Sequence, residues 1–189
     1  MDALETMRAR HSYRAYTDEP VDRETLEVLI EAARLAPSPM NSQPWRFHVA
    51  TGETRRKIDE VMSNTTVYLE EYMAVMGAAD RAAAVAGFAS NLGNAPVVIA
   101  VSVPRPTDGM SSIDMYVAAG AAIENLLLEA TEQGLATVNV TFSFWMRDKL
   151  AEILGLSEDR EIVSLIAVGH AAHAPVAPPH NADVATWHD

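Results

Sequence analysis

Cysteine is absent from this 189-residue chain, which excludes disulfides, thiolate metal sites and cysteine nucleophiles together. Basic residues are also scarce, because 14 Lys and Arg stand against 26 Asp and Glu and give a formal net charge of −12. Nucleic-acid binding relies on cations that neutralise phosphates, so this charge disfavours it. The 49% hydrophobic and 21% charged residues are typical of a folded globular protein.

No segment has the pattern of a targeting or membrane-spanning sequence. Asp2 and Glu5 stand where a signal peptide needs positive charge and then an apolar run. The most apolar helical stretch, Ile113–Ala130, contains Glu124 and Glu129, which disfavour a position in lipid. We therefore expect one cytoplasmic domain over residues 1–189, without a membrane or nucleic acid as partner.

The hydrophobic pattern predicts helices and strands along the whole chain. Helical spacing or composition marks residues 2–10, 23–35, 53–62, 66–90, 111–133 and 145–154. Alternating or continuous apolar residues mark strands at 45–49, 97–103, 136–142 and 162–168. Strands among long helices predict an α+β or α/β sheet covered by helices. The proline-containing tail, residues 170–189, is predicted to be extended, either frayed or laid along another surface, and Trp187 suggests a docked strand.

Two helices carry start signals. Asp22 is expected to cap the helix that follows it, with Val21 and Leu26 at the spacing of a hydrophobic staple. Ser111 and Asp114 resemble a capping box that opens a long helix. That helix is apolar nearly all round, which predicts a place at the centre of the fold or in a subunit interface.

Several common site motifs are missing. The nine glycines form neither a dinucleotide fingerprint nor a phosphate-binding loop, and no serine lies in a nucleophile elbow. His170 and His173 are expected to be solvated loop residues rather than a metal pair, because prolines follow them and no carboxylate lies near. We expect no metal, so a bound anion must be held by side-chain cations and loop amides.

A basic cluster stands out near the N-terminus, in Arg10-His11-Ser12-Tyr13-Arg14. Guanidinium groups form forked, charge-assisted hydrogen bonds and a serine hydroxyl adds a neutral one, so this array suits a phosphate monoester. Arginines near a helix C-terminus also complement the helix dipole. The spacing alone leaves both interpretations open.

A rigid polar loop, Ala36–Trp45, leads into the first predicted strand. Ser38, Asn41 and Gln43 offer donors and acceptors that suit a planar heterocycle with carbonyl and imide groups. The prolines of the loop lower the entropy lost when a ligand binds. The same residue types are also those expected in a simple helix-to-strand turn.

Taken together, the two segments resemble the nitroreductase family of FMN-dependent oxidoreductases. The shared pattern is Arg-His-Ser-x-Arg, then a capped helix, then Pro-Ser-x-x-Asn-Ser-Gln-Pro-Trp about thirty residues later. It continues in Asn94–Val98, in Asn125–Ala130 and in Val168-Gly169-His170, so it spans nearly the whole chain.

The resemblance implies an α+β fold with a central mixed sheet flanked by helices. It also implies a domain-swapped homodimer whose C-terminal tail wraps the partner subunit. The implied activity is ping-pong transfer of hydride from NADH or NADPH, through N5 of FMN, to a nitroaromatic, quinone or similar small acceptor. No side-chain nucleophile is required, because the flavin carries the chemistry.

The resemblance also implies which residues bind FMN. The phosphate and ribityl chain would be held by Arg10, His11, Ser12 and Arg14. The partner subunit would lend a loop containing Ser38, Pro39, Asn41 and Gln43. The strand around Val138 would lie along the isoalloxazine, with the backbone N–H of Thr141 or Phe142 near N5.

The chain departs from the family pattern in its tail. Many relatives carry an arginine or lysine there that reaches the FMN phosphate, whereas this chain has His180, a partial substitute because it is neutral near pH 7. Asn91 and Asn94 are candidates for the pyrimidine edge of the flavin. Arg55-Arg56-Lys57 is expected to be an exposed helix face rather than a contact for an anionic donor.

Other functions remain open on the sequence. The same fold could hold flavin without turnover, or act as a dehalogenase or a dehydrogenase. A third interpretation is an acidic helical dimer whose basic cluster only complements a helix end.

Overall fold

Four strands form one sheet in the order β1-β2-β4-β3 in the computed structural model, which describes residues 2–175 and 179–188. Their bounds are Arg46–Ala50 for β1, Val97–Pro104 for β2, Ala136–Val140 for β3 and Arg160–Gly169 for β4. Each neighbouring pair runs antiparallel. The expected mixed sheet is therefore wrong for these four strands, because every pair of neighbours runs in opposite directions. A parallel pairing occurs at the isolated bridge between Ser12 and Thr137.

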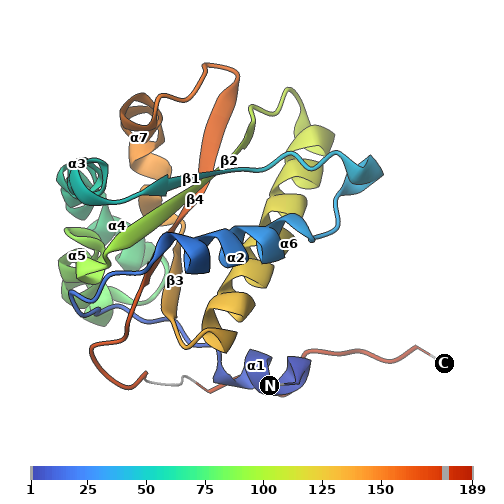
Figure 1. Ribbon diagram of the computed structural model, residues 1–189, viewed down its shortest axis with the longest axis horizontal. Helices are drawn as coiled ribbons and strands as arrows, with labels where there is room; N and C mark the ends of the chain where they lie inside the picture. Colours follow the sequence, from blue (N-terminus) through green and yellow to red (C-terminus); the bar gives the residue numbers. More distant parts are fainter. Residues whose placement is uncertain (1, 176–178, 189) are drawn as a thin grey trace.

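Helices cover both faces of this sheet (Figure 1). They are α1 (Ala3–Ala9), α2 (Arg23–Arg34), α3 (Gly52–Met62), α4 (Thr66–Val75), α5 (Ala82–Ala89), α6 (Gly109–Glu132) and α7 (Arg147–Leu154). α2 and α6 pack on one face, and α3, α5 and α7 supply the core of the other. The α+β architecture with a helix-covered sheet is confirmed. Within the described residues, no helix is both long and apolar enough to span a bilayer.

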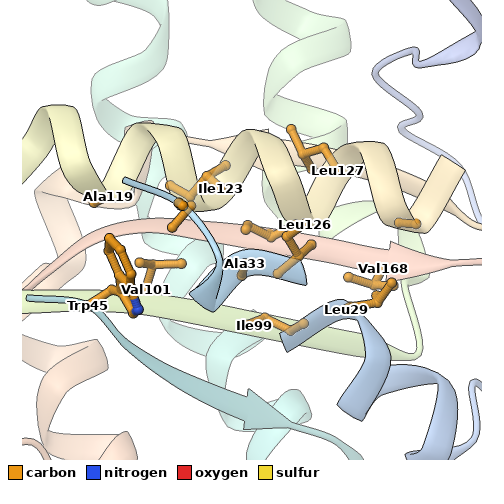
Figure 2. Packing of buried hydrophobic residues seen from close by; sticks show 14 of the residues in the cluster. Leu29, Ala33, Trp45, Ile99, Val101, Ala119, Ile123, Leu126, Leu127 and Val168 are labelled. Atoms are coloured by element: carbon orange, nitrogen blue, oxygen red, sulfur yellow. The ribbon is translucent and has the colours of Figure 1, made fainter. Parts of the chain in front are cut away.

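The core beneath α6 explains why this helix is so apolar. Leu126 and Ile123 of α6 face Ile99 and Val101 of β2, and Leu29 of α2 closes the layer (Figure 2). These side chains are at most 4% exposed, so each large-to-alanine substitution should cost about 2–5 kcal/mol. The opposite side of α6 leaves Met110, Ile113 and Val117 exposed, so the helix is central and also presents an apolar stripe.

The ends of the helices confirm some of the caps and limits predicted from the sequence and contradict others. Asp22 caps α2 as expected, accepting a hydrogen bond from the Thr25 amide. The predicted start of α6 is wrong: Asp108 is the N-cap, and Ser111 is the N3 residue that closes the capping box rather than the N-cap that opens it. The stretch 66–90, predicted to be helical from its composition, forms two helices, because Gly77 has a φ of 67° and separates α4 from α5.

The end of β3 and the C-terminal tail both differ from expectation. β3 ends at Val140, and a 3₁₀ helix, Phe142–Met146, precedes α7. The described part of the tail beyond Pro175 is exposed and runs past α1, away from the sheet (Figure 1). Trp187 is 87% exposed and docks on no part of its own chain that the structure describes. Residues 176–178 and 189 of the predicted extended tail lie outside the described residues.

Candidate functional site

The segment from Arg10 to Arg14 lies beside the first residues of β3. Ser12 forms the parallel bridge to Thr137, and the Tyr13 amide donates to the Thr137 carbonyl over 3.0 Å. Tyr16 attaches the segment to β4, because its hydroxyl donates a shared hydrogen bond to the carbonyls of Tyr13 (2.9 Å) and of Ala167 in β4 (3.3 Å). Burial raises the pKa of the Tyr16 hydroxyl, which therefore stays protonated as a donor.

The two arginines of this segment have different surroundings. Arg14 is exposed, and its guanidinium lies 3.5 Å from the Ser12 carbonyl and forms no ion pair with the residues that the structure describes. Arg10 is 28% exposed at its side chain and lies 3.4 Å, from Nε to Oε1, from Glu124 of α6. His11 contacts the Ala9 carbonyl through Nδ1 over 2.7 Å. The arginine best placed for an incoming anion is therefore Arg14, whereas Arg10 already has a carboxylate partner.

The start of the tail completes a cavity around Arg14. The Ala172 amide donates to the Ala15 carbonyl over 3.1 Å, which holds the two segments together. The resulting cavity has a volume of about 320 Å³, and its lining includes Ser12, Arg14 and His173. His173 is an exposed loop residue, as expected, but it also lies beside the basic segment, which the sequence did not predict. No recorded contact among the described residues joins His180 to either arginine.

A tight turn at 91–94 supports Arg14 from the other side. Leu92, Gly93 and Asn94 all have positive φ values, of 48°, 66° and 61°. A side chain on Gly93 would overlap the Arg14 carbonyl oxygen and lie 2.8 Å from its carbon, so only glycine allows this approach. Asn91 accepts a hydrogen bond from the Gly93 amide (3.0 Å) and also donates to the Asn94 side chain, so these two asparagines are already engaged in the turn.

Arg55 of α3 fixes this turn from within the core. Its Nε donates to the Ala95 carbonyl over 2.6 Å and its terminal nitrogen donates to the Asn91 carbonyl over 2.7 Å. It also forms an ion pair with Asp59, whose pKa is raised by burial against the opposing effect of Arg55. Arg55 is 6% exposed, so the prediction of an exposed face for residues 55–57 is wrong at this position.

The loop predicted to bind a heterocycle is strained and ordered by its own side chains. Met40, Asn41 and Gln43 have φ values of 52°, 54° and 44°, a region that non-glycine residues rarely adopt. Ser38 Oγ accepts from the Gln43 amide, and the Gln43 side chain donates to Asn41 Oδ1, both over 3.0 Å. The loop leads into β1, at the opposite edge of the sheet from β3. One chain therefore does not bring this loop to the Arg10–Arg14 segment (Figure 1).

The far end of β3 opens onto an aromatic cavity. Val138 is 4% exposed and points into the core, so only its backbone is available to a ligand. Thr141 and Phe142 follow the strand and line a cavity of about 350 Å³ together with Tyr72, Phe144 and Trp145. Trp145 stacks on Tyr68 with ring centroids 5.5 Å apart, and Tyr72 meets it edge-on at 5.4 Å.

Comparison with known proteins identifies the family and the fold. The profile of the Nitroreductase family matches residues 7–170. The chain belongs to this family. It is 26% identical to the nitrobenzene nitroreductase of Ectopseudomonas oleovorans, over 87% of this chain and 85% of that protein. It is 25% identical to the 4-nitrobenzoate reductase of Pseudomonas putida, over 86% and 82%.

Solved nitroreductase-family structures match nearly the full length. The FMN- and NADPH-dependent nitroreductase NfnB of sphigopyxis sp. strain HMH superposes with a TM-score of 0.80 at 26% identity, covering 100% of both chains. A nitroreductase with bound FMN from Desulfitobacterium hafniense DCB-2 gives a TM-score of 0.77 at 25% identity, covering 98% of this chain and 97% of that one.

Several positions around the basic segment and the aromatic cavity have no strong local sequence signal. Glu124, Gly93 and His173 reach the basic segment only through the fold. Arg55 has one weak signal, an acidic partner four residues later at Asp59, which is the spacing of a helical ion pair. Trp145 carries none, because an aromatic residue before a helix is equally typical of a core position.

Proposed function

We propose that this protein is an FMN-dependent oxidoreductase that uses NADH or NADPH to reduce a small nitroaromatic, quinone or similar acceptor. The observation that supports this most directly is the alignment of the Arg10–Arg14 segment with β3, which ends at Val140 and is followed by Thr141. The four steps along the chain from Thr137 to Thr141 span about 13 Å when extended. A phosphate group bound at one end and a redox-active ring at the other suit such a span.

The residues present fit the phosphate of FMN. Arg14 offers an exposed guanidinium, Ser12 an exposed hydroxyl, and both line the cavity of about 320 Å³ with His173. Guanidinium groups bind phosphate through forked, charge-assisted hydrogen bonds, and a hydroxyl adds a short neutral one. Gly93 and the Arg55–Asp59 pair hold the backbone of Arg14 in place, which lowers the cost of organising the site.

When bound, FMN supplies the hydride transfer that the fold itself has no group to perform. Arg10, His11, Ser12 and Arg14 would hold its phosphate and ribityl chain. The backbone of Thr141 and Phe142 would contact its ring, and the aromatic cavity beside them would exclude water and orient the acceptor. The strained 38–43 loop would cover the ring through Ser38, Pro39, Asn41 and Gln43.

A homodimer would bring that loop to the site. The loop and the basic segment lie at opposite edges of the sheet within one chain, so a shared site needs a second copy. Met40 is 99% exposed at the tip of the loop, and Met110, Ile113 and Val117 form an exposed apolar stripe on α6. Exposed apolar residues in a contiguous stripe are typical of a subunit interface.

The tail would strengthen the same dimer. Val184 and Trp187 are 78% and 87% exposed, and β1 is an edge strand whose outer side pairs with no strand among the described residues. A groove of about 440 Å³ lies between α2 and β1, with Leu26, Ile30 and Val49 in its lining. We propose that the tail of one subunit lies along β1 of the other and places Trp187 in this groove.

An absorbance spectrum of the purified protein tests the function. The expected result is a flavin spectrum that is bleached by anaerobic NADH or NADPH and restored by p-benzoquinone or nitrobenzene. Arg14→Ala should lower the FMN content, with Arg81→Ala, an exposed arginine of the same charge, as control.

Two results would contradict the proposal in different ways. Stoichiometric FMN that neither nucleotide bleaches would indicate a flavin-binding protein without turnover. Colourless protein that cannot be reconstituted with FMN, or unchanged FMN content in Arg14→Ala, would leave only a helix-end role for the basic cluster.

A further inference from the structure

The 38–43 loop is held to the sheet at its C-terminal junction by an arginine far away in the sequence. Nη2 of Arg160, the first residue of β4, donates to the Pro44 carbonyl over 2.8 Å, across 116 positions. Pro44 is buried, so its carbonyl needs a hydrogen bond from the protein in place of one from water. Arg160 supplies that bond and thereby fixes the point at which the chain leaves the loop.

The loop itself makes no such connection to the sheet. Within the described residues, the hydrogen bonds of residues 38–43 all stay inside the loop. Three of them are made by backbone amides, those of Asn41, Ser42 and Gln43. Three non-glycine residues of the loop have positive φ values, which persist only where the surroundings fix them. A change at the junction should therefore loosen the whole loop.

Arg160 is also joined to the middle of the sheet, through Ser102 of β2. The same Nη2 donates to the Ser102 carbonyl over 2.8 Å, and Nε donates to the Ser102 hydroxyl oxygen over 3.1 Å. Ser102 is fully buried and follows an irregularity in the pairing of β2 with β4. Three hydrogen bonds from one guanidinium thus tie β4, β2 and the loop junction together.

His48 of β1 completes this network. Its Nε2 lies 2.9 Å from the Ser102 hydroxyl. That hydroxyl accepts from Arg160, so it can donate its own proton to a neutral imidazole nitrogen. A protonated His48 carries a hydrogen on Nε2 and can no longer accept, and it sets a second cation against the guanidinium across one oxygen atom. Protonation of His48 therefore opposes the position of Arg160.

The charges around His48 and Arg160 are mostly positive. Burial and the charge of Arg160 both lower the pKa of His48. Arg46 of β1 adds a further positive charge near Arg160, and Asp159 is the acidic residue that acts against it. Within the described residues, no charge of the covering helices α3 and α7 shifts the pKa of His48. Proton uptake by His48 at low pH therefore competes with the guanidinium rather than with an acidic partner.

We propose that Arg160 is a positioning residue for the 38–43 loop, and that protonation of His48 weakens its hold on the loop as pH falls. In acidic solution the loop would then leave the flavin ring more readily, and FMN would bind less tightly. The effect on FMN rests on the proposed function, whereas the effect on the loop itself does not.

Hydrogen exchange in the purified full-length protein, as isolated, tests the hold on the loop. The three bonded amides of the loop report its integrity through their exchange rates. At pH 7.5, Arg160→Gln should raise these rates at least tenfold, because it removes a charge-assisted hydrogen bond to Pro44, and Arg160→Lys should restore part of the protection. Arg105→Gln is the matched control. Arg105 donates to the carbonyls of Glu158 and Arg160 at the same end of β4, but to no residue of the loop among those described.

A comparison with His48→Gln tests the dependence on pH. Glutamine can still accept a hydrogen bond from Ser102 but takes up no proton, so the loop amides should exchange as in the wild type at pH 7.5. At pH 5 the wild-type amides should exchange about three- to tenfold faster than those of His48→Gln. Comparison at one pH removes the intrinsic pH dependence of exchange.

The FMN dissociation constant should follow the loop. It should rise about tenfold in Arg160→Gln at pH 7.5, and at pH 5 it should be about three- to tenfold higher in the wild type than in His48→Gln. Both proteins then meet the same ionisation state of the FMN phosphate.

Unchanged exchange in Arg160→Gln, or an equal rise in Arg105→Gln, would overturn the role of Arg160. Equal exchange in the wild type and His48→Gln at pH 5 would overturn the role of His48. If Arg160→Gln does not fold, Arg160→Lys and the comparison with His48→Gln still decide both points. If the wild-type protein binds no FMN, the proposed function fails, and the exchange rates still decide whether Arg160 positions the loop.

Discussion

Gly93 packs against the carbonyl group of Arg14 so closely that no side chain fits between them. The contact joins two segments that are 79 positions apart, and it fixes the direction in which the Arg14 side chain points. Arg55 holds the carbonyls of Asn91 and Ala95 on either side of this glycine. The proposed phosphate site therefore depends on a buried arginine that contacts no ligand.

Gly93→Ala should displace the Arg14 backbone and strain the turn, because the φ of 66° also disfavours alanine. We expect the FMN dissociation constant to rise at least tenfold and the free energy of unfolding to fall by about 1–3 kcal/mol. Fluorescence titration and urea unfolding measure the two effects. Gly87→Ala is the control, because a side chain there meets open space within α5 and should be neutral or stabilising. Unchanged FMN affinity in Gly93→Ala would separate this turn from the site.

Glu124→Gln should strengthen FMN binding. The carboxylate lies 3.4 Å from Arg10, so it lowers the positive charge that a phosphate group would meet. We expect the FMN dissociation constant to fall about three- to tenfold, whereas riboflavin, which lacks the phosphate, should bind unchanged.

The control for Glu124→Gln is Glu53→Gln, which removes the same charge from an exposed pair with Arg56 on α3. Weaker FMN binding in Glu124→Gln would instead show that the carboxylate orients Arg10 for the ligand. An equal change with riboflavin would show that the phosphate is not involved.

His48 should make stability depend on pH. Its Nε2 lies 2.9 Å from the Ser102 hydroxyl, and burial together with the charge of Arg160 lowers the pKa of His48. The unfolded chain, with an ordinary histidine pKa near about 6.5, then binds the proton more readily than the folded one. Stability is fully present above this pH and is lost as pH falls through the lower folded pKa.

Urea unfolding at pH 7.5 and pH 5 measures this contribution. The free energy of unfolding should decrease more in the wild type than in His48→Gln, while His188→Gln, at an exposed tail position, should match the wild type. An identical decrease in all three proteins would assign the pH dependence to other groups.

Local signals predicted much of the fold and the two main segments of the site. The Asp22 cap and the apolar strand β2 depend on residues close together in the sequence, so the sequence alone predicts them. The role of Ser111 was misassigned because a capping box is nearly symmetric, and Asp108 three residues earlier is an equally good cap. Arg55, Gly93 and Glu124 act across the fold, on backbone or side chains that are distant in sequence, so no local pattern could identify them.

Trp187→Ala should weaken the proposed dimer. The side chain is 87% exposed in one chain, and its burial in the groove between α2 and β1 would remove a large apolar surface from water. Truncation of a buried aromatic residue costs about 3–5 kcal/mol, which corresponds to at least a hundredfold rise in the dimer dissociation constant. Sedimentation velocity from nanomolar to micromolar concentration should show the shift towards monomer, together with loss of FMN, because the 38–43 loop would leave the site.

Val75→Ala, which truncates an 80% exposed residue of α4, should sediment as the wild type does. A dimer of unchanged affinity in Trp187→Ala would place the tail elsewhere, and a fully folded wild-type monomer that retains FMN would remove the shared site itself.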